Sequence, residues 1–184
     1  MAHPDHVSEL DGFDRFTVSA YRTGFFLAAA GLLSWALALL GSGSVEGARW
    51  ATVVGITLSV ANIHLYDKRI RWLVPALGWG GLLALSASHL ISADWVSSAL
   101  HLGGGLQLAA LSALALKEQF CFRIPGLRAV PLFLALGIFA SFFGSLSLAA
   151  GLFALASGVI GMLAVAKVRM PLHFDIGDRS HYQI

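Results

Sequence analysis

The sequence predicts an all-α polytopic membrane protein with six transmembrane helices and both termini on the cytoplasmic side. The first observation is composition, since 57% of the 184 residues are hydrophobic and only 12% are charged. Soluble globular domains carry roughly 25% charged residues, about twice this fraction. The charges also vanish from long stretches and return in short clusters. That spacing is typical of a chain embedded in lipid.

The second observation is a set of six apolar runs, each long enough to cross a hydrocarbon core of about 30 Å at 1.5 Å per residue. The stretch 130–166 carries no charge, and as one helix it would measure roughly 55 Å. We therefore predict a hairpin there, with its turn near 144–151, rather than one tilted span. The expected spans are 21–40, 50–66, 72–91, 95–116, 130–146 and 152–168.

The third observation is the distribution of Lys and Arg. With six spans, eleven of the twelve fall on one side, and Arg49 alone falls on the other. Short cytoplasmic loops retain positive charge, so this side is expected to be cytoplasmic. The expected organisation is a polar cytoplasmic leader at 1–20, a six-helix membrane domain at 21–168 and a cytoplasmic tail at 169–184, which we expect to be solvated.

Several function classes find no support in the residues. The net charge of +2 follows from topology, and no basic stripe interleaved with aromatic residues indicates nucleic-acid binding. The lipid bilayer is the expected partner, with loop Lys and Arg near anionic headgroups. No catalytic motif is present, so no catalytic residue is assigned. A single cysteine, Cys121, excludes an internal disulfide and a Cys-based metal framework, and no metal site is assigned.

Two histidines, His89 and His101, are predicted at similar depths of roughly 8 and 10 Å below the outer surface, on consecutive spans. Two imidazoles at one depth on neighbouring helices suit a haem or a bound metal. Gly103 to Gly105 would allow a flat ring to approach. The alternative is that each histidine only hydrogen-bonds a nearby residue such as Ser97 or Gln107.

Polar residues also gather at the cytoplasmic end. Ser59, Asn62 and Tyr66 are predicted to share one face of the second span, where they could hold a headgroup, a quinone ring or a small solute. The alternative is hydrogen bonding between helices, with Tyr66 in an interfacial aromatic belt. Lys117 and Glu118 are expected to form a charge pair at the membrane interface.

Glycines recur every seven residues at Gly137, Gly144, Gly151 and Gly158. Small residues let helix backbones approach closely in lipid. This pattern predicts either tight packing of the fifth and sixth helices or a face for homo-oligomer formation or contact with other membrane proteins.

Two segments, 60–72 (VANIHLYDKRIRW) and 117–123 (KEQFCFR), resemble an uncharacterised integral membrane family of cyanobacteria and proteobacteria. The resemblance implies a bacterial inner or photosynthetic membrane and six spans. It draws attention to residues on the cytoplasmic side, namely His64, Asp67, Lys117, Glu118 and Cys121. Because the family has no assigned activity, the resemblance transfers no catalytic residue.

Our leading functional hypothesis is a non-enzymatic membrane protein that binds or helps to assemble other membrane components, because the loops are short and polar sites are few. A second hypothesis is a haem- or metal-binding redox protein that uses His89 and His101. A third is a small-solute channel or facilitator that uses Asn62 or Gln107. The absence of charge deep in any span argues against an ion-coupled transporter.

Overall fold

The computed structural model describes residues 9–177 and 183. Within this part the chain is helical and has no strand, which confirms the predicted all-α class. The first eight residues of the leader and residues 178–182 and 184 of the tail lie outside the described residues. The elements are α1 (Gly12–Leu39), α2 (Val45–Ala61), α3 (Lys68–Ala87), α4 (Ala93–Glu118), the 3-10 turn η1 (Leu127–Ala129), α5 (Val130–Phe142), α6 (Leu146–Val168) and the short α7 (His173–Ile176).

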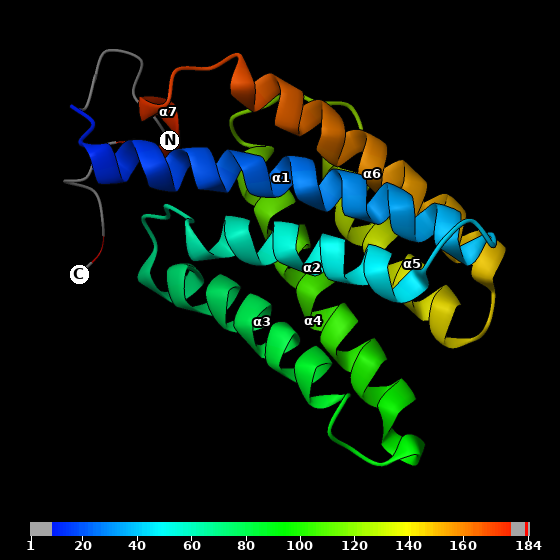
Figure 1. Cartoon of the computed structure of the whole chain (residues 1–184). Coiled ribbons are helices and arrows are strands. Elements are labelled where there is room, and N and C mark those ends of the chain that lie inside the picture. Colours follow the sequence, from blue (N-terminus) through cyan, green and yellow to red (C-terminus); the bar gives the residue numbers. More distant parts are fainter. Residues whose placement is uncertain (1–8, 178–182, 184) are drawn as a thin grey trace.

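Helix α1 lies at the centre of the bundle, between α2 on one side and α6 on the other (Figure 1). Helices α3 and α4 pair with each other, and α5 packs between α4 and α6. The core is built from apolar side chains of α1, α4 and α6, such as Phe25, Leu111 and Phe153. The short α7 lies beside the first turns of α1 (Figure 1).

Four helices, α1, α3, α4 and α6, are long and apolar enough to cross a membrane, and Leu127–Phe142 forms a shorter apolar helix. Helix α2 has 17 residues. Many outward side chains are large and apolar, among them Leu33, Leu83, Phe139 and Leu155. An apolar exterior is expensive in water but favourable in lipid, so the surface suits a membrane.

Several helix ends differ from the expected spans, and local capping accounts for two of them. Helix α1 begins at Gly12, where Asp11 and Asp14 form a capping box. Helix α2 ends at Ala61 rather than continuing to residue 66, and the Asn62 side chain donates back to the Leu58 carbonyl at 2.8 Å. Asp67 then caps α3 by accepting from the Arg69 and Ile70 amides. Residues 62–67 therefore form a loop.

The predicted hairpin within the uncharged stretch 130–166 is confirmed, and α5 and α6 are its two helices. The chain turns at Gly144, whose φ of +77° favours glycine, and α5 packs on α6. Of the four repeated glycines, Gly137 lies against the Phe153 ring, but a Cβ added at Gly151 or Gly158 would meet nothing within 4 Å. The expectation of tight α5–α6 packing is thus wrong for those two positions.

The closest backbone approach lies instead between α1 and α2. A Cβ on Gly24 would lie 2.6 Å from the Gly55 carbonyl oxygen and 2.7 Å from the Ser59 amide nitrogen. The Ser59 hydroxyl, which is buried, donates to the Tyr21 carbonyl at 3.0 Å. Small residues therefore bring α1 and α2 together, as is common for helices in lipid.

Candidate functional site

A cluster of buried charges lies where α1 begins and where α4 and α6 end, and we call this region the basic end. Its centre is Lys167 on α6, which is only 1% exposed. The Lys167 Nζ donates to Glu118 Oε2 at 2.9 Å and forms an ion pair with Asp175 on α7. One lysine thus joins α4, α6 and α7.

Glu118 is held through both of its carboxylate oxygens. Its Oε1 accepts from the Tyr21 hydroxyl at 2.5 Å and from Lys117 Nζ at 3.0 Å, while Oε2 faces Lys167. Lys117 Nζ also donates to the Tyr21 hydroxyl oxygen at 3.1 Å. The predicted Lys117–Glu118 pair is therefore present, but it belongs to a larger buried network rather than to the membrane interface alone.

Arg22 fastens the C-terminal segment to α1. Its Nε donates to Asp175 Oδ2 at 2.6 Å, and its two terminal nitrogens donate to the Met170 and Pro171 carbonyls at 2.7 and 2.9 Å. A guanidinium suits this task because it offers several donors in a rigid plane. The expectation of a fully solvated tail is wrong for residues 170–176, which pack on the bundle through these bonds.

The cations of the cluster differ in exposure. Arg22 and Lys167 are almost fully buried, whereas the Lys117 side chain is 22% exposed. Lys117 donates two of its three N–H groups within the cluster. It is therefore the most accessible cation of the three, with one N–H group unused.

A cavity of about 550 Å³ opens beside this cluster. Its wall mixes polar side chains with a larger apolar share, so it can accept a molecule with both kinds of surface. The polar lining comes from His64, Tyr66, Lys117, Glu118, Cys121 and Asp175, and the rest from Leu65, Phe120, Phe122, Met170, Phe174, Ile176 and Gly177.

Two titratable groups on the cavity wall are neutral at neutral pH. The pKa of His64 is lowered, first by burial and then by the positive charge of Lys117. The pKa of the Cys121 thiol is raised, first by partial desolvation and then by the Glu118 carboxylate. A thiol with a raised pKa is a poor nucleophile, so Cys121 is better suited to lining the cavity than to reacting.

The structure brings together most of the residues predicted at the cytoplasmic face. Five predicted residues, His64, Tyr66, Lys117, Glu118 and Cys121, line one cavity. Of the other two, Asn62 lies beside it, with its carbonyl 3.1 Å from His64 Nδ1, and Asp67 caps α3. Four residues of the cluster were not predicted, namely Tyr21, Arg22, Lys167 and Asp175. The position of Arg22 and Lys167 within long helices rather than in loops was the signal that could have indicated them.

The predicted shared face of Ser59, Asn62 and Tyr66 is wrong, because α2 ends at Ala61 and Tyr66 lies in the loop beyond it. For Ser59 the alternative of hydrogen bonding between helices is confirmed by its bond to Tyr21. Gln107 has a similar role, since its Nε2 donates to the Gly78 carbonyl at 2.7 Å and joins α4 to α3.

The structure does not bring His89 and His101 to one site. The ring of His89 stacks on that of Trp50 with the ring centroids 6.1 Å apart, and His89 Nε2 lies 3.8 Å from Glu46 Oε1. His101 instead bonds the Ser97 carbonyl at 2.8 Å and meets Phe142 edge-on. The two imidazoles line different cavities. Across residues 9–177 and 183, no three His, Cys, Asp or Glu side chains gather to hold a metal ion.

Comparisons with known proteins agree with the membrane fold. Residues 54–184 match the family described as "Uncharacterized integral membrane protein (DUF2301)". A protein of Haemophilus influenzae, itself described as uncharacterized, is 38% identical over 187 residues and is matched along 100% of both chains. No solved structure matches. The family match includes both segments on which the sequence resemblance rests and extends over more than half of the chain. The chain therefore belongs to the DUF2301 family of integral membrane proteins, for which no activity is assigned.

Proposed function

We propose that this protein binds an anionic amphiphile, a molecule with a negatively charged head and an apolar chain, in the cavity at the basic end. In this role it is a non-enzymatic binding or assembly component of the bacterial inner membrane. One observation carries the proposal, namely the accessible ammonium of Lys117 on the wall of a largely apolar cavity.

The Lys117 ammonium supports an anionic head. An anion beside Lys117 would accept the N–H group that Glu118 and Tyr21 leave unused. A hydrogen bond between an ammonium and an anion is stronger than one between neutral groups. The hydroxyl of Tyr66 and the imidazole of His64 line the same cavity and add polar groups without adding charge.

The remaining wall supports an apolar chain. Phe120, Phe122 and Phe174 line the cavity together with Met170 and Ile176. Aromatic and thioether side chains make large, adaptable apolar surfaces. Phe120 is 68% exposed, so the apolar lining continues to the surface of the bundle. A chain held there could pass directly into surrounding lipid.

The same contacts favour binding over catalysis. Both oxygens of Glu118 accept hydrogen bonds from Tyr21 or lysines, and both oxygens of Asp175 pair with Arg22 or Lys167. A general base needs an oxygen within reach of the substrate proton and free to take it. Glu118 instead positions Lys117, and Asp175 holds Arg22 and Lys167.

The proposal is tested by native mass spectrometry of the full chain purified in mild detergent, with oleate and phosphatidylglycerol as added probes. We expect wild-type protein to retain one anionic molecule. Lys117→Gln should reduce retention about tenfold, as loss of one charge-assisted hydrogen bond implies. Retention of both probes at wild-type levels by Lys117→Gln would contradict the proposal.

Lys68→Gln is the matched control, because Lys68 is an exposed lysine of the basic end that does not line the cavity. It removes the same charge and should leave retention unchanged. Equal losses in both variants would indicate general attraction between anions and a basic surface. Selective retention of oleate or of phosphatidylglycerol by the wild type distinguishes a free fatty acid from a phospholipid.

We further propose six spans with both termini in the cytoplasm. The alternation of six helices and the clustering of Lys and Arg at the basic end support this orientation. A reporter that functions only in the cytoplasm should be active when fused after Ile184, and inactive when inserted in the loop between α1 and α2. The reverse pattern of activity would overturn the orientation.

A further inference from the structure

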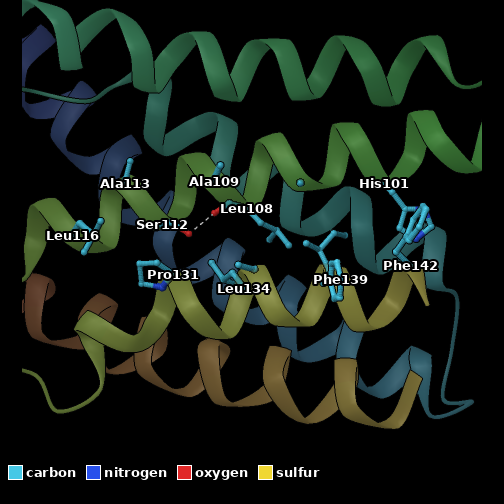
Figure 2. Close-up of a pocket in the computed structure, with 13 residues that line it drawn as sticks. His101, Leu108, Ala109, Ser112, Ala113, Leu116, Pro131, Leu134, Phe139 and Phe142 are labelled. Carbon is cyan, nitrogen blue, oxygen red and sulfur yellow. Dashed lines mark hydrogen bonds between the residues drawn. The ribbon is translucent and has the colours of Figure 1, made fainter. Parts of the chain in front are cut away.

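A second cavity, of about 610 Å³, lies between α4 and α5 (Figure 2) and shares no lining residue with the basic-end cavity. Its α4 side carries small residues, including Gly105, Ala109 and Ala113, and its α5 side is apolar. A Cβ added at Gly105 would meet nothing within 4 Å, so this part of the groove is open. The Ser112 hydroxyl is already satisfied by the Leu108 carbonyl at 2.8 Å.

His101 stands at one end of this groove beside Phe142, while Leu116 and Pro131 lie toward the other end (Figure 2). The His101 Nδ1 is 2.8 Å from the Ser97 carbonyl oxygen. A carbonyl can only accept, so Nδ1 carries a proton, and in the tautomer protonated at Nδ1 the second nitrogen, Nε2, is an acceptor. Within the described chain, no hydrogen-bond donor faces Nε2. An acceptor without a donor is costly in apolar surroundings.

We propose that this groove binds a hydroquinone, a ring that bears hydroxyl groups and an apolar chain. One hydroxyl donates to His101 Nε2, and the ring lies against Phe142 and Phe139 in the space that Gly105 leaves open. The chain follows the small residues of α4 toward Leu116. At 1.5 Å per residue, the groove from 101 to 116 is about 22 Å long, which accommodates several prenyl units.

The combination of one acceptor and two aromatic rings at the same end selects this class of ligand. A phospholipid acyl chain would fill the apolar groove but would leave Nε2 without a donor. An oxidised quinone carries only acceptor oxygens and cannot donate to Nε2 when that nitrogen is an acceptor. Aromatic rings contact one another favourably at centroid separations of about 4.5–7 Å, and His101 and Phe142 already pack edge-on at 5.1 Å.

The test measures binding of a benzohydroquinone with one prenyl unit to the detergent-solubilised full chain, by equilibrium dialysis under reducing conditions. We expect saturable binding that is about tenfold weaker in His101→Phe, which keeps an aromatic ring but loses the acceptor. The oxidised quinone should bind more weakly than the hydroquinone. His89→Phe is the control, because His89 lines a different cavity and its loss should not alter binding.

A second variant pair tests the groove itself. Gly105→Leu should fill the groove and abolish binding, whereas Gly151→Leu, also at an open position, should bind normally. Both variants should melt near the wild-type temperature, since neither Cβ meets a neighbour. The proposal is overturned if wild type shows no saturable binding, if Gly105→Leu still binds, or if quinone and hydroquinone bind equally. Disulfide-linked dimers of Gly105→Cys in membranes would instead assign the groove to a second copy of the chain.

Discussion

Replacement of Lys167 by methionine is expected to destabilise the folded protein by about 3–5 kcal/mol. Lys167 is 1% exposed and pairs with Glu118 and Asp175. Methionine fills a similar volume but leaves two nearly buried carboxylates without this cation. The loss is measured as a decrease in the free energy of unfolding in a denaturing-detergent titration.

Two further variants separate charge pairing from general damage. Lys68→Met removes an exposed lysine of the same end and should leave the free energy of unfolding unchanged. Lys167→Met combined with Asp175→Asn should be less destabilised than the two single changes predict together, because the neutral amide no longer needs the lysine. If Lys167→Met alone unfolds like the wild type, the cluster does not hold the basic end together.

Substitution of Gly24 by valine is the second change with a large expected effect. The added Cβ would lie 2.6 Å from the Gly55 carbonyl oxygen and 2.7 Å from the Ser59 amide nitrogen. These are backbone atoms and cannot rotate away, so α1 and α2 must separate. Overpacking of this kind costs about 3 kcal/mol. Separation would also break the bond from the Ser59 hydroxyl to the Tyr21 carbonyl.

The melting temperature in detergent should fall for Gly24→Val and stay near the wild-type value for Gly151→Val. Gly151 serves as the control because its added Cβ meets no neighbour within 4 Å. Similar melting temperatures for the two variants would show that close approach of α1 and α2 is not required for stability.

Much of the fold was predictable because lipid imposes a local rule on the sequence. Side chains in hydrocarbon must be apolar, and backbone groups must be paired within a helix. This rule placed the apolar helices and required a turn within the uncharged stretch 130–166, which the structure makes at Gly144. It also placed Lys117, Glu118 and Cys121 together at the end of α4.

The contacts of the basic end were harder to predict, because they join residues distant in the chain. Tyr21 and Glu118 are 97 residues apart, and Arg22 and Asp175 are 153 apart. In the sequence, charges near helix ends resemble ordinary interfacial charges. Their burial depends on α7 returning to cover them, and α7 has only four residues. A helix that short gives almost no signal in the sequence.

For the two histidines, the sequence predicted the depth in the membrane but not the direction of the side chain. Hydropathy and helical rise placed His89 and His101 at similar depths, but depth does not determine which way a side chain points. For His101 the rotation of α4 determines it, and this rotation depends on packing: Gly81 and Gly103 meet between α3 and α4, while α5 packs on another side of α4. His89 was predicted within the third span but lies in the turn beyond Ala87, where α3 ends. His89 therefore faces α2 and His101 faces α5.

The sequence alone was sufficient for helix content and the final hairpin, because these follow from polarity summed along the chain. The tertiary structure was needed to show that Lys167, Glu118 and Asp175 are buried as one cluster, and that an open groove lies between α4 and α5. Both features depend on how helices rotate and approach one another. That geometry is set by contacts between distant residues such as Gly24 and Gly55.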